Sequence, residues 1–369
     1  ADGMGCFDLG DRQLVLVRNH ELVSTDDSGG AFAVGFGSKD GGFVPGGTTH
    51  VILDAKTLTV TDQFRSLGGT IRNCSGGVTP WNTWLTCEES TTGPGREFGE
   101  GLVKNHGWVF EVPANARGLV APEPLYALGR FNHEAACVDP ETGFVYLTED
   151  RDDSVLYRFI PKQSGQLAMG GRLQAMQVVD APDLRNWSAA SLRPGGVSAV
   201  NWLDLDDVES PNDDLRHRAR AKGASLIARG EGIHMAQGEA YICSTSGGAA
   251  RLGQILRLHL SDTGEHDRLE LFFESVSTRQ FNFGDNLTVA PNGHLIVCED
   301  QYTEKVDNFL RGITPEGHAY PLARLRLQTE LAGACFSPDG TTLFVNVYAP
   351  TRTLAITGPW DQFINTVNA

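Results

Sequence analysis

Three segments of the sequence end an apolar run with acidic residues: TWLTCEE (83–89), GFVYLTED (143–150) and HLIVCED (294–300). If such runs are strands that end at one place in the fold, their carboxylates converge and raise one another's pKa unless cations compensate. Oxygen ligands suit Ca²⁺ or Mg²⁺, whereas a thiolate beside carboxylates, as at Cys87, suits a transition metal such as iron. The pattern therefore predicts a metal site containing Cys87 and several acids.

Further acids stand next to other apolar runs. The candidate carboxylates are Glu21, Glu88, Glu89, Glu134, Glu149, Asp150, Glu231, Asp285, Glu299 and Asp300. A single acid after a strand is usually solvated, but repeated endings of one kind favour a shared site. Cys298 repeats the motif position of Cys87, yet Cys87 is preferred as a ligand because a second glutamate follows Glu88. His20 and His133 each precede a candidate glutamate, and we expect them to pack beneath the site and orient it.

One arginine is a candidate for anion binding. Arg229 stands two residues before Glu231 in the segment ARGEG (228–232), where flanking glycines let the backbone approach a ligand closely. An arginine beside a metal cluster can bind a tetrahedral oxyanion through two N–H donors. Neutralisation of excess carboxylate is the alternative role for this side chain.

The sequence pattern predicts short β-strands along almost the whole chain, and these strands position the candidate residues. VDPETGFVYLTED (138–150), VAPNGHLIVCED (289–300) and FSPDGTTLFVNV (336–347) share one plan, in which a turn with Pro and Gly precedes an apolar strand and a polar ending. The chain also contains 43 glycines and 17 prolines, which is typical of many turns. Such weak repeats predict an all-β, six-bladed β-propeller, with residues 1–369 as a single domain.

One segment departs from the strand pattern. In residues 209–226, Ser210 can serve as an N-cap, Pro211 suits the first helical position and Gly223 can end a helix. We therefore expect a short inserted helix over one face of the propeller.

Charge and composition exclude several partners. The formal net charge of −16 argues against nucleic acid and against an anionic membrane, since both need a basic face. No apolar run reaches the roughly 18 to 20 residues of a membrane span. The seven cysteines are scattered and include no Cys-x-x-Cys pair, so the sequence does not indicate a disulfide framework. We expect a monomer, and since the sequence opens without Met, an N-terminal segment such as an export signal is expected to be missing.

The ordered motifs resemble those of the PhoX-type alkaline phosphatases, which are exported bacterial enzymes. The matching segments are LVRNHE (16–21), NCSGGVTPWNTWLTCEES (73–90), LGRFNHEAACVDPETGFVYLTEDR (128–151), RGEG (229–232), GDNL (284–287), VCED (297–300) and FSPDGTTLFVNV with ITGPW (336–360). The resemblance covers nearly the whole chain. It implies a six-bladed propeller, a cluster of calcium and iron (Ca²⁺, Fe³⁺) in the channel mouth, and a periplasmic or secreted location.

The resemblance also implies roles for particular residues. Cys87 is implied as an iron ligand, and Arg229 as the catalytic, phosphate-binding arginine. The implied metal ligands are Cys87, Glu88, Glu89, Glu134, Glu149, Glu231, Asp285, Asn286 and Glu299. The chain departs from the family at Tyr348, where a Gln is common. By this resemblance the sequence begins inside the family's N-terminal region, so we expect the first blade to be incomplete or built partly from C-terminal strands.

The function that follows is hydrolysis of small-molecule phosphate esters, with phosphomonoesters first and diesters as an extension. Two alternatives stay open at this point. A calcium-dependent propeller lactonase or esterase also gathers acids around Ca²⁺, but it needs no thiolate. A non-catalytic extracellular propeller would use calcium only to stabilise its blades, and it would have no hydrolase activity to lose on chelation.

Overall fold

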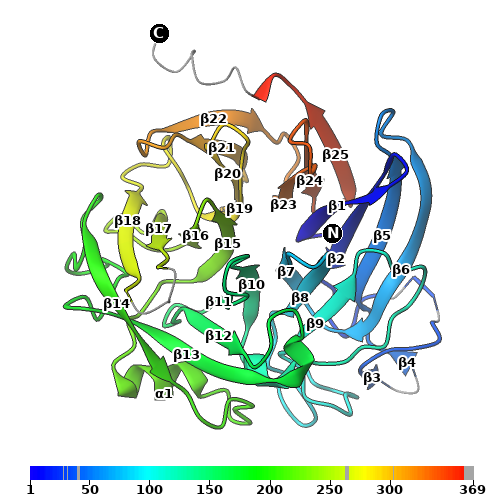
Figure 1. Ribbon diagram of the computed structural model, residues 1–369, viewed down its shortest axis with the longest axis horizontal. Coiled ribbons are helices and arrows are strands. Elements are labelled where there is room, and N and C mark those ends of the chain that lie inside the picture. The colour runs from blue at the N-terminus through cyan, green and yellow to red at the C-terminus, as the bar shows by residue number, and fades with distance from the viewer. Residues whose placement is uncertain (28, 31, 40–41, 262–265, 302, 361–369) are drawn as a thin grey trace.

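The structure is a computed structural model, and it describes residues 1–369 except 28, 31, 40–41, 262–265, 302 and 361–369. Within these residues the chain is almost entirely β-structure, and its sheets surround a central axis (Figure 1). None of the described helices has the length and apolarity needed to cross a membrane. The all-β prediction is confirmed, and the arrangement is propeller-like.

The N-terminal part of the chain forms two sheets, with orders β1-β2-β5-β6 and β7-β8-β9. Their strands are β1 (Met4–Gly10), β2 (Gln13–His20), β5 (Gly46–Asp54), β6 (Val60–Thr70), β7 (Asn73–Val78), β8 (Thr83–Glu88) and β9 (Val109–Pro113), and a hairpin of β3 (Ser38–Lys39) and β4 (Gly42–Phe43) lies between β2 and β5. All four strands of the first sheet come from residues 4–70. The expectation of an incomplete or shared first blade is therefore wrong.

The middle of the chain forms one sheet of nine strands in the order β10-β11-β12-β13-β14-β18-β17-β16-β15. The strands are β10 (His133–Val138), β11 (Val145–Glu149), β12 (Tyr157–Pro161), β13 (Gly171–Val178), β14 (Val197–Asp204), β15 (Gly230–Ala236), β16 (Glu239–Ser244), β17 (Gln254–His259) and β18 (Arg268–Glu274). Strand β14 pairs with both β13 and β18. It thereby joins two four-stranded groups, β10 to β13 and β15 to β18. The inner strands of these groups, β10 and β15, are the two edge strands of the sheet and do not pair with each other.

The last two sheets close the ring against the first. They contain β19 (Gly284–Val289), β20 (Leu295–Glu299), β21 (Phe309–Ile313) and β22 (Ala319–Arg324), then β23 (Leu331–Phe336), β24 (Thr342–Val347) and β25 (Arg352–Thr357). Asn346 Nδ2 donates to the Asp2 carbonyl oxygen at 2.6 Å, and the Ala1 amino group donates to Thr351 Oγ1 at 3.0 Å. These bonds join the N-terminus to the last sheet of the ring.

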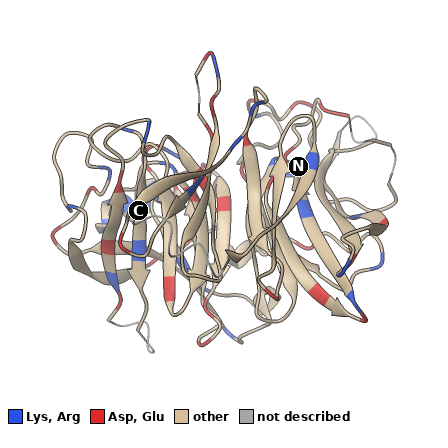
Figure 2. Cartoon of the chain, turned by 90° about the horizontal axis from the view of Figure 1, so that it is seen from above, with Lys and Arg blue, Asp and Glu red and all other residues tan. Residues whose placement is uncertain are grey.

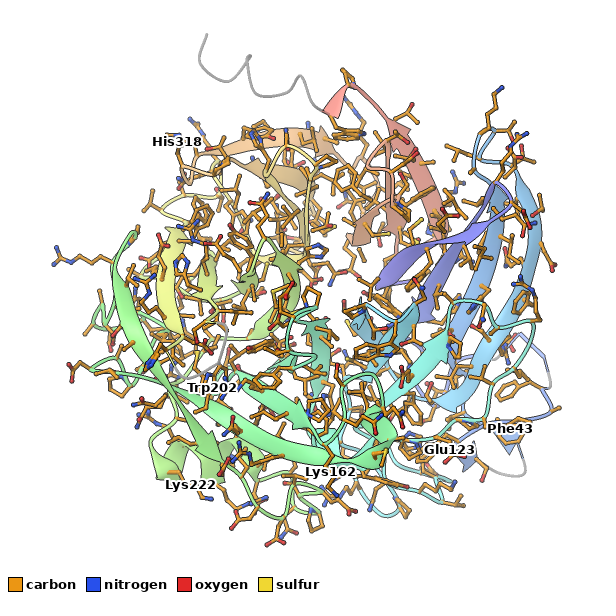
Figure 3. The ribbon with its side chains drawn as sticks, in the orientation of Figure 1. Phe43, Glu123, Lys162, Trp202, Lys222 and His318 are labelled. Carbon is orange, nitrogen blue, oxygen red and sulfur yellow. The ribbon has the colours of Figure 1, made fainter. Side chains whose placement is uncertain are left out.

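The turn between β10 and β11 shows why the repeated motif forms a hairpin. Asp139 accepts hydrogen bonds from the backbone N–H of Glu141 at 3.1 Å and from Thr142 Oγ1 at 2.6 Å. Gly143 then adopts a positive φ of 74°, which suits glycine. The apolar residues on either side enter the core between neighbouring sheets, whereas Lys222 and His318 lie at the periphery (Figure 3). Figure 2 shows acidic and basic positions interspersed along the outer strands.

The inserted helix is present but begins later than predicted. Helix α1 (Leu215–Lys222) follows β14, and Asp214 rather than Ser210 occupies its N-cap position. The Ser210 hydroxyl instead accepts the backbone N–H of Asp214 at 2.9 Å and closes the preceding turn. Gly223 ends the helix in the left-handed conformation, as predicted (φ 105°).

Candidate metal centre

Four inner strands place their second residue at one end of the ring. These residues are Cys74 in β7, Glu134 in β10, Glu231 in β15 and Asp285 in β19. In each strand the register of pairing with the neighbouring strand shifts between the first and the fourth residue, so this second residue lies within the bulge. A β-bulge changes the direction of a side chain, so the four bulges account for the convergence of these residues on one cavity.

A second set of acids directly follows the second strand of a sheet. Glu21 follows β2, Glu89 follows β8, Asp150 follows β11 and Asp300 follows β20. Because successive residues of an extended chain point to opposite sides, the last strand residue and the acid after it face different surroundings. Three of these acids are the second member of an acidic doublet: Glu88–Glu89, Glu149–Asp150 and Glu299–Asp300. In each doublet the second acid lines a cavity at this end of the ring, and the first does not.

Glu88, the first acid of its doublet, is a buried structural residue. Its carboxylate accepts backbone N–H groups of Ile71 at 2.9 Å, Gly107 at 2.8 Å and Trp108 at 3.1 Å. The second partner of Oε1 is His106 Nδ1 at 2.7 Å, and both side chains are fully buried. Glu88 thereby fixes the chain segments on both sides of β8 and has no part in the acid cluster.

Glu299 and Glu149 have comparable positions. Glu299 accepts Arg311 Nε at 2.7 Å in a buried ion pair. Glu149 accepts the Tyr157 hydroxyl at 2.9 Å and lies 3.6 Å from Arg216 Nη1. Burial raises the pKa of Glu149 to about 8. The structure therefore places both glutamates inside the sheets rather than at the predicted metal site.

The second members of the doublets and the inner-strand residues line one cavity of about 300 Å³. Its lining residues are Asp2, Glu21, Arg72, Cys74, Glu89, Glu134, Asp150, Arg229, Glu231, Asp285, Asp300, Val306, Asn308, Thr329, Glu330 and Tyr348. We call this the mouth cavity. The residues predicted as ligands or as the phosphate-binding arginine that lie here are Glu89, Glu134, Arg229, Glu231 and Asp285. The candidate carboxylates Glu21, Asp150 and Asp300 line it as well.

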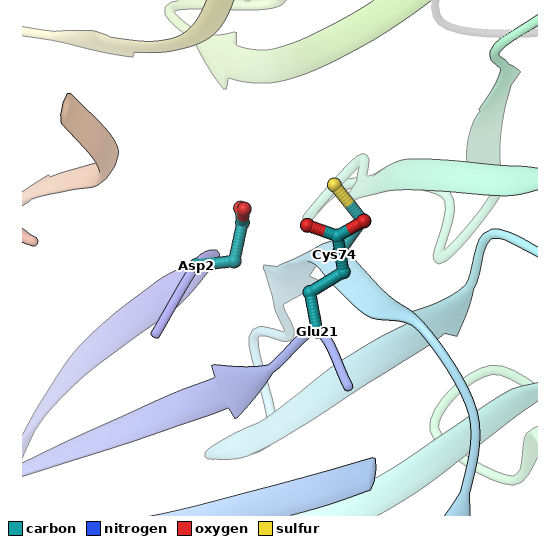
Figure 4. Close-up of side chains that lie close together, drawn as sticks. All are labelled: Asp2, Glu21 and Cys74. Carbon is teal, nitrogen blue, oxygen red and sulfur yellow. The ribbon is translucent and has the colours of Figure 1, made fainter. Parts of the chain in front are cut away.

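Four overlapping groups in the mouth cavity could each hold a metal ion. They are Asp2 with Glu21 and Cys74, Cys74 with Glu89 and Glu134, Glu134 with Glu231 and Asp285, and Asp285 with Asp300 and Glu330. Within each group the potential ligand atoms lie within 4.8 Å of one another. Figure 4 shows the first group, in which side chains from two sheets approach each other. Because Cys74, Glu134 and Asp285 are shared, the groups form a continuous chain.

The concentration of acids perturbs their ionisation. Burial, followed by repulsion from neighbouring carboxylates, raises the pKa of Asp2, Glu134, Glu231 and Asp285 well above the usual range. The same causes raise the pKa of Glu330 to about 12. Bound cations would reverse this effect by favouring the charged carboxylates.

Two arginines partly compensate the acids. Arg72 Nη2 lies 2.8 Å from Glu21 and 2.7 Å from Glu89. Arg229 contacts Asp150 through Nε at 2.8 Å and Glu231 through Nη2 at 2.7 Å. Both arginines have a positive φ, 45° and 52°, and each stands two residues before an inner-strand ligand candidate. The positive φ of both arginines therefore occurs directly before the bulges at the start of β7 and β15.

Glu134 supplies a direct test of whether the site fits cations. Its side chain is fully buried, and neither carboxylate oxygen has a hydrogen-bond partner among the described residues. One oxygen of Asp2 is also buried without a partner. A buried carboxylate without a donor is strongly unfavourable, and metal coordination is one of the few ways to satisfy it. The donor set of several carboxylates and one thiol thus fits oxygen-seeking cations with a softer metal at Cys74.

Cys87, Cys298 and Asn286 lie outside the acid–thiol groups. Cys87 is fully buried in the hydrophobic core beside Leu85, and burial raises the pKa of its thiol. Cys298 packs in another apolar cluster. Asn286 braces inner strands, because its Nδ2 donates to Asp285 at 3.1 Å and its Oδ1 accepts the N–H of Gly333 at 2.6 Å. The structure therefore places Cys87 and Asn286 apart from the acid–thiol groups, and their role as metal ligands stays a prediction.

The two histidines lie next to cavity residues in the chain without lining the cavity, and His133 is buried whereas His20 is half-buried. His20 Nε2 lies 2.9 Å from Thr49 Oγ1, and His133 Nε2 donates to the Gly129 carbonyl at 2.9 Å. Burial lowers the pKa of each to about 3, so both are neutral. His133 also stacks on Phe131, with ring centroids 3.6 Å apart, and so supports the start of β10 from below.

The sequence analysis did not select Cys74, Asp2, Glu330 or Arg72. A signal for Cys74 was present, because RNCSG (72–76) aligns with RGEGI (229–233) at the start of an inner strand, and Cys74 then occupies the motif position of Glu231. Asp2 and Glu330 precede β1 and β23 without any acidic doublet. Only closure of the ring brings them into the cavity.

Comparison with known proteins gives a family. A family model described as alkaline phosphatase PhoX matches residues 46–351. Pseudomonas fluorescens PhoX, solved in complex with the transition-state analogue vanadate, has a TM-score of 0.73 and 18% identity over 96% of this chain and 88% of that chain. The gluconolactonase XC5397 from Xanthomonas campestris has a TM-score of 0.45 and 12% identity over 97% and 96%. A search of curated proteins found no match.

The family match spans most of the chain and includes the strands that carry Cys74, Glu89, Glu134, Glu231 and Asp285. The fold agrees with that of the Pseudomonas enzyme over nearly the full length. The acid–thiol groups of the mouth cavity provide candidate metal sites. The chain therefore belongs to the PhoX alkaline phosphatase family and is a metal-dependent phosphatase.

Proposed function

We propose that the protein hydrolyses phosphate monoesters of small molecules in the mouth cavity, with diesters as a second substrate class. The cofactor in this proposal is a cluster of calcium and iron. The observation that carries it is the chain of acid–thiol groups centred on Glu134, whose two buried oxygens have no hydrogen-bond partner in the described part of the chain.

The ligands in this proposal follow the geometry. Cys74 replaces Cys87 as the thiolate that binds iron, since its thiol lies within 4.8 Å of ligand oxygens in two of the groups. The surrounding carboxylates, among them Glu89, Glu134, Glu231 and Asp285, are hard oxygen donors that suit calcium. When bound, such ions supply Lewis-acid stabilisation of the phosphoryl oxygens.

Arg229 is proposed to bind the phosphoryl group. Its guanidinium lines the mouth cavity with only 19% of the side chain exposed, so its charge is poorly screened by water. Asp150 and Glu231 hold it at the site through ion pairs of 2.8 and 2.7 Å. A planar guanidinium can bind two phosphoryl oxygens at once, which orients the ester as well as attracting it.

Serine substitution at two cysteines tests the proposal. After reconstitution with calcium and iron, Cys74→Ser should lose bound iron, any thiolate-to-iron absorption band and at least about 100-fold in hydrolysis of 4-nitrophenyl phosphate. Cys87→Ser is the matched control, because this thiol is equally buried but lies in the hydrophobic core. Iron and activity that survive in Cys74→Ser but vanish in Cys87→Ser would contradict the assignment.

We also propose finer features of the molecule. Six inner strands, β1, β7, β10, β15, β19 and β23, support a six-bladed propeller in which the nine-stranded sheet counts as two blades. A single domain, a monomeric state and a periplasmic or secreted location are proposals that extend the family resemblance. Calcium sites of modest affinity suit extracellular concentrations of the ion. Sedimentation and cell fractionation would test the monomer and the location.

A further inference from the structure

A second cavity of about 420 Å³ adjoins the mouth cavity and shares Arg72 and Glu89 with it. Its other lining residues are Ser90, Thr91, Thr92, Arg96, Glu97, Phe98, Asn132 and Arg151. Most belong to the connection between β8 and β9, and Arg151 follows β11 and Asp150. We call this space the side cavity. A substrate whose phosphoryl group lies in the mouth cavity could extend into it past Arg72.

The side cavity is rich in arginine although the whole chain has a net charge of −16. No described carboxylate forms an ion pair with Arg96, whose Nη2 donates to the Pro211 carbonyl. Arg151 donates through Nη2 to Asn132 at 3.0 Å, and the same nitrogen lies 3.5 Å from Asp213 in a weak, half-exposed ion pair. Among the described lining residues the carboxylates are Glu89 and Glu97, so the guanidinium groups of Arg72, Arg96 and Arg151 outnumber them.

The walls of the side cavity are held in place by buried contacts. Arg130 is 1% exposed and donates to the carbonyl oxygens of Thr91, His106 and Ser210. It thereby ties the β8–β9 connection to the segment that precedes α1. Thr92 Oγ1 donates to the Glu97 carbonyl at 2.7 Å within the connection. The arginine-rich wall is therefore a fixed part of the fold.

We propose that the side cavity receives the leaving group of the substrate and favours phosphate esters whose leaving group carries a second anionic group. This inference rests on the proposed hydrolysis in the mouth cavity. Arg96 and Arg151, whose side chains line the cavity, can donate charge-assisted hydrogen bonds to a carboxylate or phosphate. Phe98, which is 78% exposed at the same wall, offers an apolar contact for the body of the leaving group.

Two nearly isosteric esters measure this preference: 4-carboxyphenyl phosphate and 4-carbamoylphenyl phosphate. Their ratio of kcat/KM is compared in the metal-loaded wild type and in Arg96→Gln. The ratio should fall about tenfold in the variant, as expected for loss of a charged hydrogen bond. Arg172→Gln is the matched control, since Arg172 is 57% exposed on β13, pairs with Asp204 and lines neither cavity. Its ratio should equal that of the wild type.

Charge reversal separates recognition from loop damage. In Arg96→Glu, kcat/KM for the 4-trimethylammoniophenyl ester should rise relative to kcat/KM for the carbamoyl ester. A disordered loop would instead lower kcat/KM for both esters and would not reverse the preference for charge. Unchanged ratios in both Arg96 variants would overturn the side-cavity inference while leaving the phosphatase intact. No turnover of any of the three esters by the metal-loaded wild type would overturn the proposed function, and the inference with it.

Discussion

Replacement of Glu134 by glutamine should change how the stability of the metal-free protein depends on pH. Burial and then neighbouring acids raise the pKa of Glu134 in the folded state. Above the unfolded-state pKa of about 4.3, the unfolded chain releases this proton while the folded chain retains it, so stability falls by about 1.4 kcal/mol per pH unit until the folded pKa is reached. Glutamine has the same shape and does not titrate.

The magnitude follows from one proton. Between about pH 6 and about pH 8, the unfolding free energy of the metal-free wild type should fall with pH more steeply than that of Glu134→Gln, by at most about 1.4 kcal/mol per pH unit. Urea unfolding of chelator-treated protein at these pH values measures the difference. Glu141→Gln is the control, because Glu141 is exposed in the turn between β10 and β11. Equal slopes for the wild type and Glu134→Gln would refute the reasoning.

Three further variants test the structural framework. Glu88→Ala removes the acceptor of three buried N–H groups and should lower the unfolding free energy by at least about 3 kcal/mol with or without metal, as measured by urea unfolding. Arg311→Met leaves Glu299 buried without its cation and should lower the unfolding free energy by about 3 to 5 kcal/mol, whereas the double variant with Glu299→Gln should recover much of it. In Gly232→Ala the new Cβ would lie 2.7 Å from the Asp285 carbonyl oxygen, so a loss of about 1 to 3 kcal/mol and lower metal content are expected from thermal unfolding and elemental analysis. A variant that retains wild-type stability contradicts the contact assigned to it.

The strand pattern and the location of the acids could be predicted from the sequence because both depend on local signals. Proline, glycine and Asx residues mark the turns, and apolar runs mark the strands between them. The helix start was misplaced because Ser210 and Asp214 are both good capping residues, and only the tertiary position of the segment decides between them. These errors concern a few residues and do not change the architecture.

The identity of the ligands was less predictable. In TCEE, LTED and VCED the two acids of each doublet look equivalent in sequence, but alternation turns Glu88, Glu149 and Glu299 into the sheets. Which member faces the cavity depends on where the strand pairing ends, and that is a tertiary property. The thiol illustrates the same point, since Cys87 lies beside acids in sequence while Cys74 lies beside them in space.

The acidic doublets also explain how the metal-free cluster stays assembled against its own repulsion. Glu88 fixes the N–H of Ile71, and the neighbouring Arg72 carbonyl accepts the N–H of Glu89 at 2.9 Å. Glu88 and Glu299 accept backbone N–H groups, and Glu149 accepts the Tyr157 hydroxyl, so each doublet joins one acid that is held inside the sheets to one that enters the cavity. Repulsion among the cavity acids cannot relax by moving the strand ends, since these ends are tied by buried hydrogen bonds. The strain is therefore relieved by proton uptake or by cations, and the same rigidity that raises the pKa of Glu134 pre-forms the site for metal.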